Sequence, residues 1–128
     1  MSVGLLLITH ANLGKVLLDT AKVATKISPP AIDVIEADWN CDPEKIFDQS
    51  LIAVKKLNTG HGVLVLTDLY GATPNNIATR ILTTPDLRII TGLNLPMLIK
   101  ILNYSECDLD MLVEKALEGG SAGVIEVT

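Results

Sequence analysis

The chain has 128 residues, a length that suits one domain with a single core, and 48% of them are hydrophobic. Ten basic and 15 acidic residues give a formal net charge of −5, which argues against nucleic-acid binding and favours a basic protein partner. Only 3% of the residues are aromatic. We therefore expect an aliphatic core, as in parallel sheets covered by helices.

The sequence shows no export signal and no apolar run long enough to cross a bilayer. Only Ser2 and Val3 precede the first apolar run, and no positive charge leads it. Cys41 and Cys107 lie far apart and form no Cys-x-x-Cys pair, so we expect reduced thiols and no metal site. These features predict a soluble cytoplasmic protein.

The first predicted elements are a strand and a helix. Residues 3–8 form a short apolar run, typical of a buried strand, which Thr9 and His10 end abruptly. Apolar residues then recur at helical spacing over residues 13–26, with Asn12 as the expected N-cap. A histidine between the first strand and the first helix lies where open α/β sheets bind their ligands.

A second strand and helix follow. The Ser-Pro-Pro sequence at residues 28–30 ends the first helix, because proline disfavours helical backbone in the residue before it. Residues 32–37 predict the second strand. Asp42 followed by Pro43 predicts a helix start, and an apolar stripe extends that helix to Leu57.

The most apolar strand is the third, at residues 62–67, and Asp68 follows it directly. Thr73 followed by Pro74 is a second cap-and-proline pair, which predicts a helix over residues 74–82 with Thr73 as its cap. The Asp68 carboxylate and the start of the next helix are therefore expected at the same edge of the sheet as His10.

The last third of the chain predicts a strand, two helices and a final short strand. The strand spans residues 87–91 and the first helix residues 95–102. Asp108 caps the second helix, which Gly119-Gly120 is expected to end. Residues 123–127 predict an edge strand. The alternation indicates a doubly wound α/β fold around a mainly parallel, open sheet.

A strand order of 2-1-3-4 would bring His10 and Asp68 together at the switch point of the sheet. A carboxylate beside an imidazole fixes its tautomer and orients the free nitrogen. Gly71, Ala72 and Thr73 open a helix N-terminus, whose dipole favours an anion. A nucleophilic His10, an orienting Asp68 and an anion-binding helix N-terminus would together be suited to phosphoryl transfer through a phosphohistidine.

Each of these residues also has a simpler interpretation. Alone, His10 could be a polar loop residue, Asp68 a turn cap and Gly71 a source of backbone freedom. His61 starts the third strand at the opposite edge and is expected in a surface loop. Trp39 and Tyr70 could be interface groups or packing residues. The chain has no GxxxxGK[ST] and no GxGxxG motif, so we expect no direct use of ATP.

The chain resembles the IIA domain of the mannose-type family of the bacterial phosphoenolpyruvate:sugar phosphotransferase system (PTS). Three pieces carry the resemblance over essentially the whole length: the strand ending in Thr9-His10, the segment at residues 62–76 containing Asp-Leu-Tyr-Gly-Ala-Thr-Pro, and Gly-Leu-Asn-Leu-Pro-Met-Leu at residues 92–98. Thr73-Pro74 favours this sugar-type branch over the related subunit of dihydroxyacetone kinases. The departures are mild, because Ala72 and Thr73 stand where many members have Gly and Ser.

The resemblance implies the chemistry of the site. The histidine matching His10 accepts a phosphoryl group from the phosphocarrier protein HPr and passes it to a cysteine or histidine of a IIB component. The aspartate matching Asp68 binds the other ring nitrogen. We expect Thr9, together with the loop from Gly71 through Ala72 to Thr73, to lie around the phosphoryl group, with no cofactor.

The resemblance also implies an assembly. The family sheet gains an antiparallel edge strand from the C-terminus, exchanged between the subunits of a homodimer, and residues 123–127 fit that strand. We expect residues 1–128 to form a single IIA domain, with IIB on a separate chain and membrane IIC and IID components contacted only peripherally. A regulatory phosphohistidine protein without a transport role is the alternative function, and a non-catalytic flavodoxin-like binding domain is a third.

Overall fold

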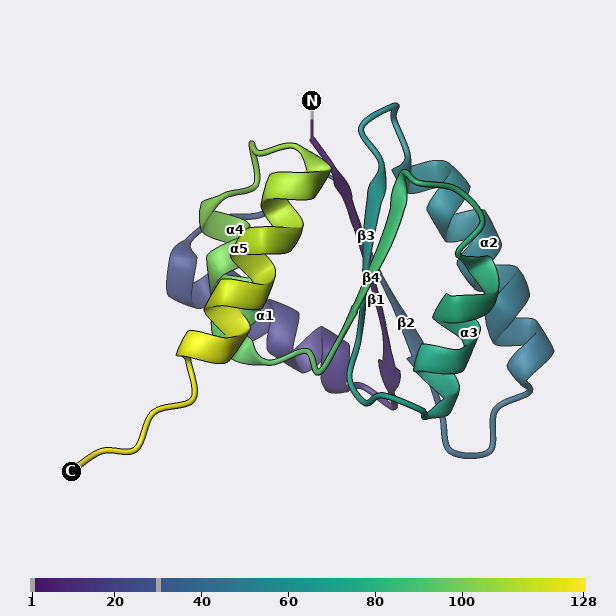
Figure 1. The fold of residues 1–128 in the computed structure, drawn as a ribbon. Helices are drawn as coiled ribbons and strands as arrows, with labels where there is room; N and C mark the ends of the chain where they lie inside the picture. The colour runs from purple at the N-terminus through teal and green to yellow at the C-terminus, as the bar shows by residue number, and fades with distance from the viewer. Residues whose placement is uncertain (1, 30) are drawn as a thin grey trace.

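Four strands form one parallel sheet at the centre of the computed structural model, which describes residues 2–29 and 31–128 (Figure 1). Their order is β2-β1-β3-β4, and each neighbouring pair is parallel. This confirms the order and direction predicted from the sequence. The strands are β1 (Gly4–His10), β2 (Ile32–Ala37), β3 (Val63–Thr67) and β4 (Leu87–Thr91).

Helices cover both faces of the sheet. Figure 1 shows α1, α4 and α5 on one face and α2 and α3 on the other, which is the doubly wound arrangement. In the described residues the helices are α1 (Leu13–Thr25), α2 (Pro43–Leu57), α3 (Thr73–Ile81), α4 (Leu95–Asn103) and α5 (Leu109–Ala122). None of these helices is long and apolar enough to cross a membrane.

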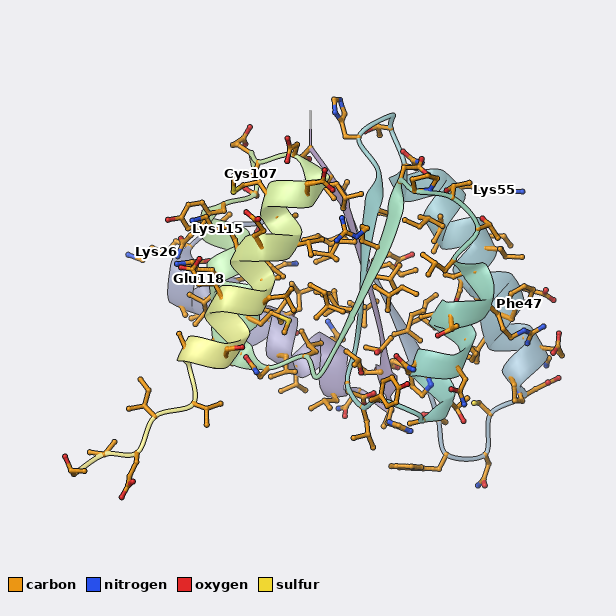
Figure 2. The ribbon with its side chains drawn as sticks, in the orientation of Figure 1. Lys26, Phe47, Lys55, Cys107, Lys115 and Glu118 are labelled. Carbon is orange, nitrogen blue, oxygen red and sulfur yellow. The ribbon has the colours of Figure 1, made fainter. Side chains whose placement is uncertain are left out.

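The core consists of two aliphatic layers, one on each side of the sheet. Alternate residues of β1 enter different layers, because successive side chains of a strand point to opposite faces. Leu5 and Leu7 pack beneath α1, α4 and α5, whereas Leu6 and Ile8 pack beneath α2 and α3. Side chains fill both spaces between helices and sheet (Figure 2). The same alternation directs Thr9 and His10 to opposite faces.

The helix starts agree with the sequence prediction at two caps. The Asp42 side chain accepts a hydrogen bond from the Glu44 backbone N–H at 3.0 Å. The Asp108 side chain accepts one from the Met111 backbone N–H at 2.9 Å. These bonds satisfy amides that the first turns of α2 and α5 leave without intrahelical partners.

The N-cap of α1 is at Asn12 as predicted, whereas the predicted cap of α3 at Thr73 is wrong. Asn12 occupies the N-cap position of α1 but makes no side-chain cap bond. The buried Thr9 hydroxyl accepts the Gly14 N–H instead, at 2.8 Å, because Thr9 faces α1 across the strand end. Thr73 lies inside the first turn of α3, and Ala72 occupies the N-cap position, again without a side-chain bond.

The predicted end of α5 at Gly119-Gly120 is also wrong, because the helix continues to Ala122. These glycines allow close helix packing. A Cβ atom added at Gly119 would lie 2.5 Å from the Lys100 Cβ of α4, well inside van der Waals contact. The sequence therefore uses glycine here to bring α5 against α4.

Residues 124–128 leave the body of the molecule as an extended segment (Figure 1). Gly123 forms a turn, and the predicted strand at residues 123–127 does not form within this single chain. The apolar side chains of Val124, Ile125 and Val127 are 83%, 74% and 93% exposed. A strand needs a hydrogen-bonding neighbour, and the turn after α5 directs this segment away from its own sheet.

Candidate functional site

One carboxylate oxygen holds His10 in two places. Asp68 Oδ2 lies 2.9 Å from the His10 ring Nδ1 and also accepts the His10 backbone N–H at 2.9 Å. The predicted contact between these residues is therefore present. It forms because β1 and β3 are neighbours, with Ile8 opposite Thr67, so that the next polar residues of both strands meet at their carboxyl ends.

This contact assigns the tautomer of His10. A carboxylate only accepts hydrogen bonds, so the proton of the neutral imidazole is placed on Nδ1 and the lone pair on Nε2. The His10 and Asp68 side chains are only 14% and 8% exposed, so little water competes for the bond. Asp68 Oδ1 is buried with no partner among the described residues. His10 is thus the main polar partner of a nearly buried carboxylate.

His10 lines a cavity of about 300 Å³ between two loops. The loop that follows β2 contributes Asp38, Trp39 and Cys41 to one wall. The residues that open α3 form the other wall: Gly71, Ala72, Thr73 and Asn76. A phosphoryl-sized group would fit in this space beside the imidazole.

The start of α3 presents an electropositive backbone to the cavity. Gly71 has a φ of +81°, and no atom lies within 4 Å of a Cβ added there. Glycine is therefore required for its backbone conformation, which turns the chain into α3. The Ala72 N–H bonds the Leu69 carbonyl at 3.3 Å. The first-turn amides of α3 and its dipole favour an anion at this end.

Two predicted site residues do not line the cavity: Asp68, which contacts His10 directly, and Thr9. The Thr9 side chain is fully buried on the opposite face of the sheet, where its hydroxyl accepts the Gly14 N–H. The period of two along a strand separates it from His10. The arrangement gives Thr9 a supporting position under α1, whereas His10, Asp68 and the start of α3 share one side.

Trp39, whose position in the sequence is compatible with both an interface and a packing role, lies at the site. Its indole stacks on the His10 imidazole, with 4.2 Å between ring centroids and 21° between ring planes. The parallel register pairs His10 with Ala37, two residues before Trp39. The pairing of β1 with β2 places the loop after β2 beside the end of β1, and it is the feature from which the proximity of Trp39 to His10 could be inferred.

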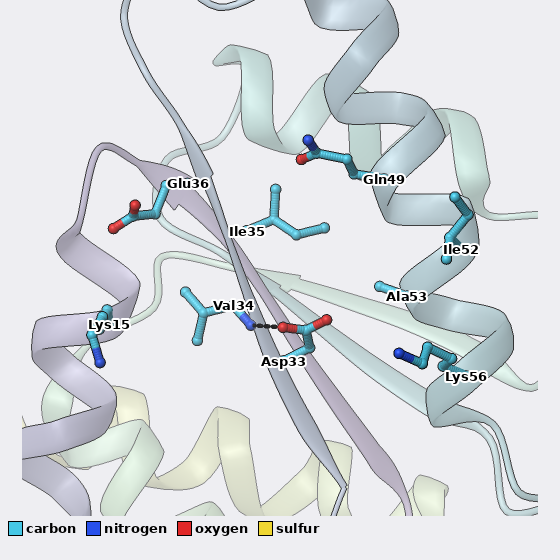
Figure 3. Close-up of a pocket in the computed structure, with 9 residues that line it drawn as sticks. All are labelled: Lys15, Asp33, Val34, Ile35, Glu36, Gln49, Ile52, Ala53 and Lys56. Carbon is cyan, nitrogen blue, oxygen red and sulfur yellow. Dashed lines mark hydrogen bonds between the residues drawn. The ribbon is translucent and has the colours of Figure 1, made fainter.

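A larger groove of about 590 Å³ runs along β2 between α1 and α2 (Figure 3). Its lining includes charged side chains of both signs: Lys15, Lys56, Asp33 and Glu36. Asp33 Oδ1 accepts the backbone N–H of Val34 at 2.8 Å, which partly occupies the free edge of β2. The groove contains none of the predicted site residues.

The described ranges 2–29 and 31–128 contain two cysteines and, besides His10, a second histidine. No group of three or more histidine, cysteine, aspartate or glutamate side chains there could hold a metal ion. Cys41 and Cys107 are both free thiols. His61 is exposed next to Gly62, before β3 and at the opposite edge of the sheet from His10, as expected.

The family model described as "PTS system fructose IIA component" matches residues 4–117. The chain belongs to this family. The PTS mannose-specific EIIAB component of Escherichia coli (strain K12) is 31% identical over 129 residues, a match that covers 97% of this chain and 39% of that protein. The chain therefore spans about two fifths of the length of the curated relatives that it matches.

Solved structures of IIA proteins share the fold of this IIA chain. The mannose/sorbose-specific IIA subunit from Enterococcus faecalis aligns with a TM-score of 0.87 and 25% identity, over 100% of this chain and 96% of that one. The EIIA component from Streptococcus agalactiae aligns with a TM-score of 0.85 and 21% identity, over 97% and 96%. The second likeness concerns the fold alone.

Proposed function

We propose that this IIA chain is a phosphoryl carrier of sugar uptake, which accepts a phosphoryl group from HPr on His10 and passes it to a IIB component. The observation that carries the proposal is the 2.9 Å contact between His10 Nδ1 and Asp68. It leaves Nε2 as the nucleophilic atom, beside a cavity bounded by the start of α3. Membership of the PTS family supports the same assignment.

The transfer is an in-line displacement at phosphorus. The Nε2 lone pair of His10 forms the new P–N bond while the P–N bond of the donor phosphohistidine breaks, and the leaving imidazole keeps that electron pair. The ring of His10 gains positive charge, which the Asp68 carboxylate stabilises through Nδ1–H. The α3 amides and the Thr73 hydroxyl would hold the phosphoryl oxygens. Catalysis is then mainly positioning and electrostatics.

Several finer features belong to the same proposal. The phosphoryl donor is a protein phosphohistidine, so the transfer consumes no nucleotide at this site. The protein would act in the cytoplasm and meet membrane IIC and IID components only peripherally. Residues 1–128 would form one IIA domain. Residues 123–127 would supply an antiparallel edge strand to a second copy, which gives their exposed apolar side chains a partner.

The proposal is tested with labelled phosphoenolpyruvate, enzyme I and HPr. We expect the wild-type chain to acquire an acid-labile label and His10→Ala to acquire none, with an unchanged far-ultraviolet circular dichroism spectrum. The chain has two histidines, so His61→Ala is the matched control and should label normally. A label retained by His10→Ala would remove His10 from its proposed role.

The regulatory alternative uses the same phosphohistidine and differs in the fate of the phosphoryl group. Purified, labelled protein mixed with IIB components encoded in the same genome distinguishes the two functions. Rapid loss of label to a IIB component supports the transport role. Stable label in the presence of every IIB component would favour binding to a sensor or regulator.

A further inference from the structure

Trp39 covers one face of the imidazole that carries the proposed chemistry. The two rings are nearly parallel, with their centroids 4.2 Å apart. Trp39 itself is 78% exposed, so little of its surface is buried against the protein. A tryptophan that is mostly exposed and yet stacked on a nearly buried histidine contributes more to that histidine than to the core.

The backbone around Trp39 fixes the position of the stack. The Ala37 carbonyl accepts the Ala11 N–H at 3.2 Å, which joins the ends of β1 and β2 directly beside His10. The Cys41 N–H bonds the Asp38 carbonyl at 3.0 Å and closes a turn around Trp39. Asp42 then caps α2. The indole is therefore presented by a short loop that is anchored at both ends.

We propose that Trp39 is a positioning residue for phosphoryl transfer, which acts through the imidazole of His10. This inference rests on the proposed function of His10. Asp68 fixes one edge of the ring, and the indole restricts rotation of the ring out of its plane. As Nε2 bonds phosphorus, the ring gains positive charge, and an aromatic face stabilises a cation stacked on it. The contact is thus stronger in the transition state than in the resting protein.

Three substitutions separate the aromatic contact from bulk and from docking. Trp39→Ala removes the side chain, Trp39→Leu keeps apolar bulk without a π face, and Trp39→Phe keeps a smaller aromatic ring. The measurement is the rate of phosphorylation by phospho-HPr at increasing donor concentration, in rapid-quench experiments. We expect the maximal rate to fall about three- to tenfold in the alanine and leucine variants, with KM for phospho-HPr within about twofold, and to recover most of the loss with phenylalanine.

Two spectroscopic measurements follow the stack directly, one of them without phosphoryl transfer. The ring current of the indole should shift the His10 ring protons upfield in the NMR spectrum of the wild type, and Trp39→Leu should abolish that shift. Trp39 is the single tryptophan of the chain, so its fluorescence should also change on phosphorylation of His10 and not in His10→Ala.

The outcomes distinguish this inference from the function on which it rests. A wild type that HPr does not phosphorylate overturns the proposed function. A phosphorylated wild type with equal maximal rates in Trp39→Leu overturns the role of the aromatic face alone. A change confined to KM would make Trp39 a docking residue and overturns the positioning role. An unshifted His10 resonance in the wild type removes the stack itself.

Discussion

At the scale of single residues, the site depends on one oxygen atom. Asp68 Oδ2 binds both the backbone and the ring of His10, so it fixes where the side chain starts and how its ring is turned. The next residue, Ala11, has a φ of +45°, a left-handed conformation that costs a non-glycine residue energy. The chain accepts this strain where it turns from His10 into α1.

Replacing Asp68 tests the importance of that oxygen. We expect Asp68→Ala to slow phosphorylation by phospho-HPr about 10- to 100-fold, because the imidazole loses its orienting acceptor and the stabilisation of its positive charge. The substitution removes a nearly buried charged group, whose burial costs free energy, so we expect the fold to persist. Circular dichroism and thermal unfolding would test this. Asp68→Asn retains an acceptor oxygen without charge and should lie between wild type and alanine. An unchanged rate in Asp68→Ala would remove the proposed role of the carboxylate.

The sequence predicted the contact of His10 with Asp68, because it follows from the adjacency of two strands. It did not predict the stack of Trp39 on His10, since that stack depends on the conformation of a short loop. Thr9 is expected at the phosphoryl group because it lies with His10 at the carboxyl end of the first strand. A shift of one residue along a strand reverses the face, and the structure places Thr9 under α1.

At the scale of elements, α4 and α5 show how one residue type can serve two purposes. A Gly-Gly pair is typical of a helix end, which is why the sequence indicated one at Gly119. The structure instead packs Gly119 against Lys100 and Gly120 against Met97, with α5 continuing to Ala122. Local sequence does not distinguish the two cases, because the close approach depends on a different helix.

Alanine substitutions measure the cost of separating these helices. A Cβ at Gly119 meets the Lys100 Cβ at 2.5 Å, an atom that moves only with the backbone of α4. We expect Gly119→Ala to lower the free energy of unfolding by about 1–3 kcal/mol in urea titrations, despite the better helix propensity of alanine. A Cβ at Gly120 meets the flexible tip of Met97 at 2.8 Å, so Gly120→Ala should cost less. A Gly119→Ala variant as stable as wild type would show that helix propensity outweighs the contact.

At the scale of the whole molecule, the alternation of strands and helices was enough to predict the doubly wound sheet. Parallel strands with right-handed crossovers leave few topologies, and the order 2-1-3-4 places His10 at the switch point. The C-terminal residues could not be assigned in the same way. Their apolar side chains are exposed in this chain, and the strand proposed for them would need a hydrogen-bonding neighbour from a second copy.

Deletion of residues 124–128 tests the proposed exchange of the C-terminal strand. If a second copy receives this segment, the full chain should be a dimer in light scattering after size exclusion, and the shortened chain a monomer. Ile125→Asp should weaken the dimer in the same way, because a charge would enter the buried side of the added strand. His10 and Asp68 come from one chain, so the shortened protein should still be phosphorylated by HPr. A monomeric full chain at tens of micromolar, or a dimer that survives the deletion, would contradict the exchange.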